Sequence, residues 1–306
     1  MNKLEELENN LIFLIFFEQD FDPIYQVSNP NPILKPDVTL VTSFFDIGMF
    51  QKGTDQTYTA DKYVGWMSTF RFIDNPLYMY VDKDKYADIF RRVRQNGLRN
   101  RTKIIILDRR KMWSFNLKSN ISRIFSNPSY PKFYPNTVNP EYSCAMHAKY
   151  EVIKRSAKEN FFNTKYFAWI DVGFFREMAN MSETNHDSFT IHTPSKFNDT
   201  KVAYNEVFSP WRLSLRQIMR GNEVWVGGGF FLGDVDVIQT WAEDYMYYTE
   251  RFIEQRLMNT DQQVVYAMAQ PSIHKKLGKR RVAIQPYKGD NSSDWFYLGY
   301  LCRKNS

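Results

Sequence analysis

The chain has 306 residues, enough for one large α/β domain or two small ones with a substantial core. Aromatic residues make up 17% of it, and the formal net charge is +6 with a sequence pI near 9.0. Its lysines and arginines are scattered along the chain. This disfavours a nucleic-acid groove and is compatible with an anionic small ligand such as a nucleotide.

The cysteines and the N-terminal segment bear on the compartment. Two cysteines, Cys144 and Cys302, are too few for a disulfide framework or a zinc cluster. A reducing compartment, the cytoplasm, is therefore expected, with a single disulfide, a membrane-peripheral location and a secretory lumen left open. The apolar run at residues 11–17 is shorter than the ~20 residues that cross a bilayer, and acidic residues precede it. No transmembrane segment is expected, and residues 1–35 are treated as a lead-in segment.

Strand-like and helix-like patterns alternate between residues 38 and 171. Residues 46–53 read as a loop, and residues 109–140 as a long loop with short helical pieces. Such alternation predicts an α/β fold with a mostly parallel central sheet flanked by helices. The predicted strands are 38–45, 76–82, 102–108 and 165–171, and the predicted helices are 61–73, 83–97 and 141–160.

The pattern changes in the second half of the chain. Residues 222–234 read as two short strands separated by a triple glycine. Strands of alternating polarity are predicted over 188–194 and 201–208, helices over 236–257 and 259–270, and a last strand within 279–290. Since neither an internal repeat nor a linker interrupts the chain, residues 36–301 are predicted to form a single domain.

Four predicted strands end in an aspartate, at Asp46, Asp82, Asp108 and Asp171. Ligands of open α/β sheets bind at this edge. Asp171 is the strongest candidate for a metal ligand, because a hard oxygen held at a tight turn suits a divalent cation that also binds phosphate. Gly173 would let such a ligand approach the backbone. The alternative for Asp171 is a cap or an Asx-turn.

Asp82 and Asp84 form a literal D-x-D and compete with Asp171 for a metal. Lys83 and Lys85 flank them, and Asp84 is well placed to cap the following helix. A solvated cap is therefore the favoured interpretation of this pair.

A triple glycine, Gly227, Gly228 and Gly229, lies between apolar residues in "VGGGFFLG". Glycine weakens strands, so the run predicts either backbone amides that face a ligand or a bulge with close packing. Both interpretations stay open.

"TDQQVV" opens a predicted helix at Asp261. Capping of the helix is one explanation for this acid, because the first amides of a helix attract a carboxylate. The adjacent Gln262 and Gln263 instead suggest a polar site for hydroxyl-rich ligands.

Four motifs in this order, "VTSFFDIG", "NFFNTKYFAWIDVGFFR", "VWVGGGFFLG" and "TDQQVV", resemble the HtrL/YibB-like family, which includes WlaTC-type bacterial glycosyltransferases. The resemblance covers most of residues 38–270. It implies a GT-A-like fold, with residues 36–175 as a nucleotide-binding half and 176–301 as an acceptor- or sugar-binding half. It further implies a nucleotide-sugar donor, with a UDP-linked hexose as the first choice, and a carbohydrate or glycoconjugate acceptor.

The resemblance also implies roles for single residues. A strand that ends in D-x-D holds Mn²⁺ or Mg²⁺ on the donor diphosphate, and the match falls on Asp171, with Gly173 in place of the second acid. The triple glycine matches a small-residue strand that shapes the sugar pocket. Asp261 and Gln262 match an acid–amide pair near the reacting sugar.

Sugar transfer requires a neutralised leaving diphosphate and a base for the acceptor hydroxyl. Asp261 is the candidate base. The end of the first strand is expected near the nucleotide base or ribose. The residues expected to bind the nucleotide there are Thr42, Ser43, Phe45 and Asp46, and the lysines that would neutralise the diphosphate without a metal are Lys149, Lys154 or Lys288.

Two other classes of function compete with this one. The missing second acid at position 173 is compatible with a non-catalytic nucleotide- or carbohydrate-binding protein on the same fold. A basic RNA-binding protein would need a stripe of aromatic residues and arginines on exposed strands, and no such concentration occurs.

Overall fold

The structure is a computed structural model that describes residues 36–53, 55–95, 97–180, 188–278, 280–290 and 294–305. The lead-in segment 1–35 and its apolar run lie outside the described residues. Residues Pro36–Ser306 belong to one compact unit. Among its described helices, none is long and apolar enough to cross a bilayer.

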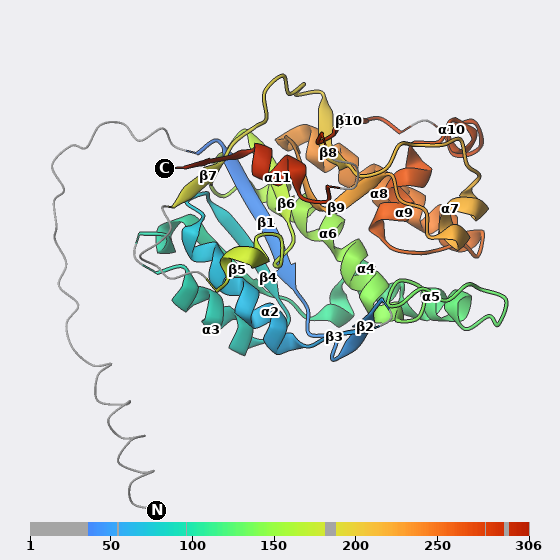
Figure 1. Ribbon diagram of the computed structural model, residues 1–306, viewed down its shortest axis with the longest axis horizontal. Coiled ribbons are helices and arrows are strands. Elements are labelled where there is room, and N and C mark those ends of the chain that lie inside the picture. The colour runs from blue at the N-terminus through green and yellow to red at the C-terminus, as the bar shows by residue number, and fades with distance from the viewer. Residues whose placement is uncertain are drawn as a thin grey trace, which may run out of the picture. The chain divides into compact units, whose positions relative to one another are not determined.

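A seven-stranded sheet runs through this unit in the order β10-β8-β9-β6-β1-β4-β5 (Figure 1). β9 is antiparallel to its neighbours β6 and β8, and every other adjacent pair is parallel. The prediction of a mixed α/β fold with a mostly parallel central sheet is confirmed. The strands are β1 (Val38–Phe44), β4 (Leu77–Val81), β5 (Thr102–Ile106), β6 (Tyr166–Ile170), β8 (Lys201–Glu206), β9 (Val226–Asp234) and β10 (Ala283–Tyr287).

Helices cover both faces of this sheet, so strands such as β4 and β6 are buried along their whole length. Alternate residues of β1 therefore enter two different apolar clusters. Val41 packs in the cluster that contains α6 and α8, whereas Leu40 packs in the cluster that contains α2 and α3. Figure 1 shows α3 beside β4, and α8 beside β8 and β9.

The described helices keep the order that the sequence predicts and add three that it does not, α7, α10 and α11. The helices are α2 (Ala60–Met67), α3 (Asp84–Val93), α4 (Trp113–Asn116), α5 (Lys118–Phe125), α6 (Pro140–Glu159), α7 (Leu215–Gly221), α8 (Val235–Glu254), α9 (Asp261–Met268), α10 (Pro271–Leu277) and α11 (Tyr297–Leu301). Single 3₁₀ turns are η1 (Ser68–Phe72), η2 (Arg99–Arg101), η3 (Arg109–Lys111) and η4 (Arg176–Met178).

Two small antiparallel sheets complete the fold. β7 (Phe189–Ile191) pairs with β11 (Arg303–Asn305), so the predicted strand at 188–194 lies outside the central sheet. β2 (Phe50–Lys52) pairs with β3 (Gln56–Tyr58). The predicted loop at 46–53 is therefore partly a hairpin, which the sequence conceals because its strands have only three residues each.

The triple glycine does not separate two strands. Residues 226–234 form the single strand β9, and its pairing with β8 shifts register between Tyr204 and Asn205. A bulge absorbs the glycines, as one of the two sequence interpretations proposed. β8 itself is buried at four consecutive positions, since it lies inside the sheet instead of showing one polar face to water.

α6 is the helix that carries Lys149 into the core. Asn139 caps it by accepting hydrogen bonds from the amides of Glu141 and Tyr142, and Pro140 occupies its first turn. It ends at Asn160, whose left-handed conformation (φ 38°) closes the last turn. These two firm ends fix which side chains of the helix face the sheet.

Candidate functional site

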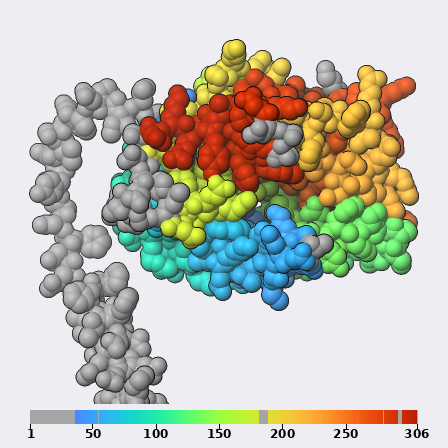
Figure 2. All heavy atoms as spheres, in the orientation of Figure 1, coloured from blue at the N-terminus to red at the C-terminus, as the bar shows by residue number. Residues whose placement is uncertain are grey.

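A cleft of about 800 Å³ opens at the carboxyl ends of β1 and β6, beside the glycines of β9 and the first residues of α9. Figure 2 shows the molecule hollowed between the segment that carries β2 to α2 (blue) and the C-terminal segment (red). Its walls are largely aromatic, and its polar groups converge at the bottom. The aromatic lining residues include Phe50, Tyr58, Tyr63, Trp66, Tyr142, Trp295 and Phe296.

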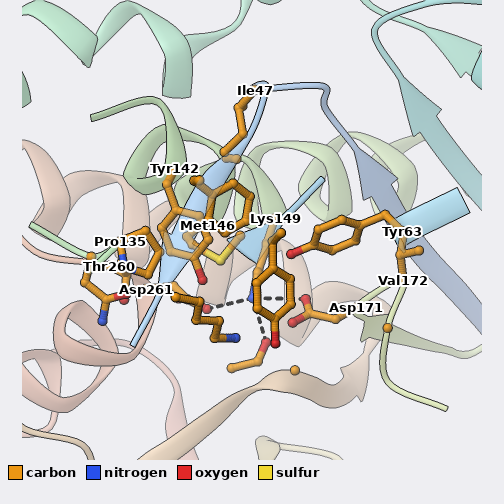
Figure 3. Close-up of a pocket in the computed structure, with 18 of the residues that line it drawn as sticks. Ile47, Tyr63, Pro135, Tyr142, Met146, Lys149, Asp171, Val172, Thr260 and Asp261 are labelled. Atoms are coloured by element: carbon orange, nitrogen blue, oxygen red, sulfur yellow. Dashed lines mark hydrogen bonds and ion pairs between the residues drawn. The ribbon is translucent and has the colours of Figure 1, made fainter. Parts of the chain in front are cut away.

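Lys149 lies at the bottom of the cleft and joins three parts of the fold (Figure 3). Its Nζ lies 3.0 Å from Oδ1 of Asp171, after β6, and 3.0 Å from Oδ2 of Asp261, in α9. It also donates to the carbonyl of Gly228 in β9, at 2.9 Å. An ammonium group has three donor positions, so these three contacts use all of them.

The buried ion pair fixes the charges at this point. Burial alone would lower the pKa of Lys149, but the carboxylates of Asp171 and Asp261 outweigh it and raise the pKa. Burial raises the pKa of Asp261, and the nearby Lys149 opposes that change. Lys149 is therefore a permanent cation that holds two carboxylates in place.

The two carboxylates differ in what they offer to a ligand. The side chain of Asp261 is only 3% exposed, whereas that of Asp171 is 40% exposed. Trp169 donates from Nε1 to Oδ1 of Asp171 at 2.7 Å, the same oxygen that Lys149 contacts. Among the described residues Oδ2 of Asp171 accepts no hydrogen bond, so this oxygen is free to receive one from a ligand.

The three glycines have different surroundings. A Cβ at Gly228 would overlap the carboxylate of Asp261, so only glycine lets the strand approach that acid. Gly228 and Gly229 line the cleft. Gly227 does not itself line the cleft: a Cβ there would lie 3.4 Å from Val207 and 3.5 Å from the carbonyl of Trp295, a residue that does line it.

The end of β1 supplies part of the predicted nucleotide site. Ser43, Phe45 and Asp46 line the cleft, whereas Thr42 does not. Thr42 is fully buried inside β1, which contradicts its predicted contact with a nucleotide.

Asp46 is already paired. Lys83 and Tyr86 each donate to its Oδ2 at 2.6 Å. Burial opposes ionisation, but these hydrogen bonds outweigh it and lower the pKa of Asp46 to about 2. Asp46 therefore borders the cleft as a bound counter-ion of Lys83.

The literal D-x-D is a structural feature, although not the solvated cap that the sequence favours. The carboxylate of Asp82 is 3% exposed, accepts from the amide of Asp46 and lies 3.2 Å from Nε of Arg109. The capping residue of α3 is Lys83, so Asp84 is its first helical residue and not its cap. Asp108 is bound to Arg110 at a separate place, outside the cleft.

Lys154 and Lys288 do not reach the cleft. Lys154 pairs with Glu243 at 3.2 Å, and Lys288 pairs with Glu206 at 3.7 Å. Both predictions that these lysines neutralise a diphosphate are therefore wrong. Gln262 lines the cleft as predicted, but Gln263 accepts from Thr260 and so completes the cap of α9.

The surroundings of Asp171 do not suit a D-x-D metal site. A Cβ at Gly173 would lie 2.6 Å from the indole ring of Trp66, so the second acid of such a motif has no room there. Lys149 already fills the space between the other two carboxylates. Within the described residues no group of three or more His, Cys, Asp or Glu side chains could hold a metal ion.

Two charged residues of the cleft were not predicted. Lys52, in β2, and Arg176, just after the Asp171 turn, both line it and are exposed. Arg176 was visible as the last letter of "WIDVGFFR", but nothing in the sequence indicates that a three-residue strand brings Lys52 to the same place.

The two cysteines are not among the residues that line the cleft. Cys144 and Cys302 are both free and buried, so no disulfide joins them.

No curated protein compared with the chain matches it. Residues 36–277 match the model of a bacterial family described as of unknown function, HtrL_YibB. Because this match extends over most of the chain and includes the whole Lys149 site, the chain belongs to the HtrL/YibB family.

Proposed function

We propose that the chain is a glycosyltransferase of GT-A-like fold that moves a sugar, such as a hexose, from a UDP-linked or related donor to a carbohydrate or glycoconjugate acceptor. The observation that carries the proposal is the half-exposed Asp171, held by Lys149 and Trp169 at the bottom of a cleft of about 800 Å³. An open α/β sheet binds nucleotides at this edge. A cleft of this size accommodates a ligand as large as a nucleotide sugar.

The walls of the cleft support the same ligand class. Tyr63 and Trp66 form an edge-to-face pair, with ring centroids 4.9 Å apart, and Phe50 packs against Tyr142 at 5.1 Å. Aromatic faces stack on nucleobases and on the apolar faces of sugars. Gln262, at the start of α9, supplies an amide for sugar hydroxyl groups.

Asp171 and Asp261 take different parts in this mechanism. The base role first considered for Asp261 is better supported for Asp171, because Asp261 is buried and its Oδ2 is held by Lys149. The free Oδ2 of Asp171 accepts the proton of the acceptor hydroxyl or faces the positive charge that develops at the sugar. Asp261 acts through Lys149 and is a positioning residue.

A second function has one observation in its favour. Lys149 pairs with both carboxylates, and a site whose charges are compensated in this way also suits a non-catalytic nucleotide- or carbohydrate-binding protein. Turnover separates the two functions.

The test is nucleoside diphosphate release from a panel of UDP-, GDP-, CDP- and dTDP-sugars, with and without Mn²⁺ and with mixed glycan acceptors. We expect release from one donor class, at least about tenfold faster than from the others. Binding of a donor without release in any combination would favour the non-catalytic function. Failure of every donor to bind would contradict both functions.

Gly228→Ala and Gly227→Ala make a matched pair in this assay. The new Cβ at Gly228 displaces Asp261 and with it Lys149, so turnover should fall by about tenfold or more. Gly227→Ala places its methyl group at ordinary contact distance from Val207 and should leave turnover near wild type. Thermal melts of both variants show whether the fold is intact.

A further inference from the structure

The cleft is lined by three cations and three carboxylates among the described residues. The cations are Lys52, Lys149 and Arg176, and the carboxylates are Asp46, Asp171 and Asp261. Asp46 is neutralised by Lys83, outside this set. Lys149 spends all its donors on protein oxygens, so it has none for a ligand. Lys52 and Arg176 are thus the cations available to an anion in the cleft.

Neither of these two cations forms an ion pair with any residue that the structure describes. Nζ of Lys52 lies 5.5 Å from the ring centroid of Tyr58, and the rings of Tyr58 and Trp66 are 6.0 Å apart. Cζ of Arg176 lies 6.0 Å from the ring centroid of Trp66. Each cation thus lies beside one ring of this aromatic pair, and Nζ of Lys62 lies 4.1 Å from the ring centroid of Tyr58. Desolvation lowers the pKa of Lys52, and the charge of Asp171 opposes that change.

Arg176 is also held in a fixed orientation. Its guanidinium lies 4.8 Å from the ring centroid of Phe296, and one nitrogen donates to the carbonyl of Gly173 at 3.3 Å. Aromatic contacts of this kind orient a guanidinium while leaving its other donors free. Such a fork binds phosphate oxygens in pairs.

We propose that Lys52 and Arg176 bind the diphosphate of the donor directly, in the role that a divalent metal would otherwise take at Asp171. The inference rests on the proposed function and specifies how it handles the leaving group. Trp66 contributes twice, because its ring lies beside the guanidinium of Arg176 and occupies the space that a second acid at position 173 would need.

In the transfer step the bond between the anomeric carbon and the diphosphate oxygen breaks, and its electron pair leaves with the diphosphate. The acceptor oxygen bonds to the anomeric carbon, and its proton passes to Oδ2 of Asp171. The diphosphate gains one negative charge in this step, and Lys52 and Arg176 stabilise that charge.

The experiment is calorimetric titration of the full chain with UDP, uridine and inorganic pyrophosphate, in EDTA and in Mn²⁺. We expect UDP or pyrophosphate to bind in EDTA with an affinity within about threefold of that in Mn²⁺. Lys52→Met and Arg176→Gln should each weaken this binding by roughly tenfold to a hundredfold and leave any uridine binding unchanged. Lys158→Met, an exposed lysine of α6 outside the cleft, is the control and should change nothing.

Three results would overturn the inference. They are binding that EDTA abolishes, wild-type affinity in both cleft variants, and no binding of UDP or pyrophosphate in either buffer. A transferase that works only with Mn²⁺ would contradict this inference and leave the proposed function standing. Metal-free diphosphate binding without turnover of any donor would support this inference and contradict the proposed transferase function.

Discussion

Two pairs of aspartates lie at the carboxyl edge of the same sheet, and the fold uses them differently. Asp46 and Asp82, at the ends of β1 and β4, are bound by Lys83, Tyr86 and Arg109. Asp171 and Asp261 share the single cation Lys149, and Asp171 keeps one oxygen free toward the cleft.

The difference lies in how completely each pair is satisfied. A carboxylate whose oxygens are both held by protein donors offers little to a ligand. The Asp46–Asp82 pair is of that kind, although its spacing in the sequence looks more like a metal motif. The Asp171–Asp261 pair, assembled from residues 90 positions apart, is the one that retains chemical capacity.

The largest expected effect comes from removing the cation of each pair. Lys149→Met leaves Asp171 and Asp261 facing each other without a counter-ion, and breaking a buried pair in this way costs about 3–5 kcal/mol of unfolding free energy. Lys83→Met removes a half-exposed lysine from Asp46 and should cost about 1 kcal/mol or less. Urea denaturation at neutral pH measures both. Equal losses would contradict the difference in burial between Lys149, which is 3% exposed, and Lys83, which is 46% exposed.

An intermediate effect is expected on activity when one acid of each pair is neutralised. Asp171→Asn removes the charge at the cleft and should slow transfer by about a hundredfold, equivalent to about 3 kcal/mol of barrier. Asp82→Asn should keep most of the activity, because Asp82 does not line the cleft. The measurement is turnover of both variants on the preferred donor. A larger loss of turnover for Asp82→Asn would mean that the chemistry belongs to the Asp46–Asp82 pair and not to Asp171.

The order of the same two variants should reverse for stability, with the larger loss of unfolding free energy in Asp82→Asn. Asp82 is bound by Arg109 and by the amide of Asp46, so its replacement weakens two contacts and lowers the unfolding free energy by roughly 1–3 kcal/mol. Asp171 is half-exposed, and its amide replacement still accepts from Trp169. Denaturation curves of the two proteins thus serve as the control for the activity assay.

Much of the fold follows from local patterns in the sequence. The strands β1, β4 and β6 are dense apolar runs, and buried parallel strands have that composition. The hairpin of β2 and β3 was missed because exposed three-residue strands leave no periodic signal. β8 was predicted as a strand of alternating polarity, but its Asn205 is buried and hydrogen-bonded to Asp294 and Leu298.

The site was only partly predictable, because its contacts join distant segments. Asp171 and Gln262 were found from a strand end, a helix start and motifs, and Lys149 was one of three lysines expected to neutralise a diphosphate. That Lys149 binds two carboxylates instead of a diphosphate depends on which turn of α6 faces the sheet, and the sequence pattern of that helix does not determine it. Gly173, expected to let a ligand approach the backbone, does line the cleft, but the indole of Trp66, more than one hundred positions earlier, occupies the space that a side chain at 173 would need.

The smallest expected effect is the pH dependence that distinguishes Asp46 from Asp261. Hydrogen bonds from Lys83 and Tyr86 outweigh burial and lower the pKa of Asp46 to about 2, below the value of about 3.9 for an unfolded chain. An acid with a lowered pKa stabilises the fold above its unfolded pKa, and this contribution is lost as the pH falls toward 2. Asp46→Asn should therefore cost about 1 kcal/mol at pH 7, because solvent screens part of the interaction, and the difference from wild type should shrink as the pH falls from about 4. Burial instead raises the pKa of Asp261, so its contribution changes in the opposite direction and weakens as the pH rises above the unfolded value. Urea denaturation of wild type, Asp46→Asn and Asp261→Asn between pH 3 and pH 7 measures how the free-energy difference from wild type changes with pH for each variant. Changes of the same sign would contradict the prediction that hydrogen bonding dominates at Asp46 and burial at Asp261.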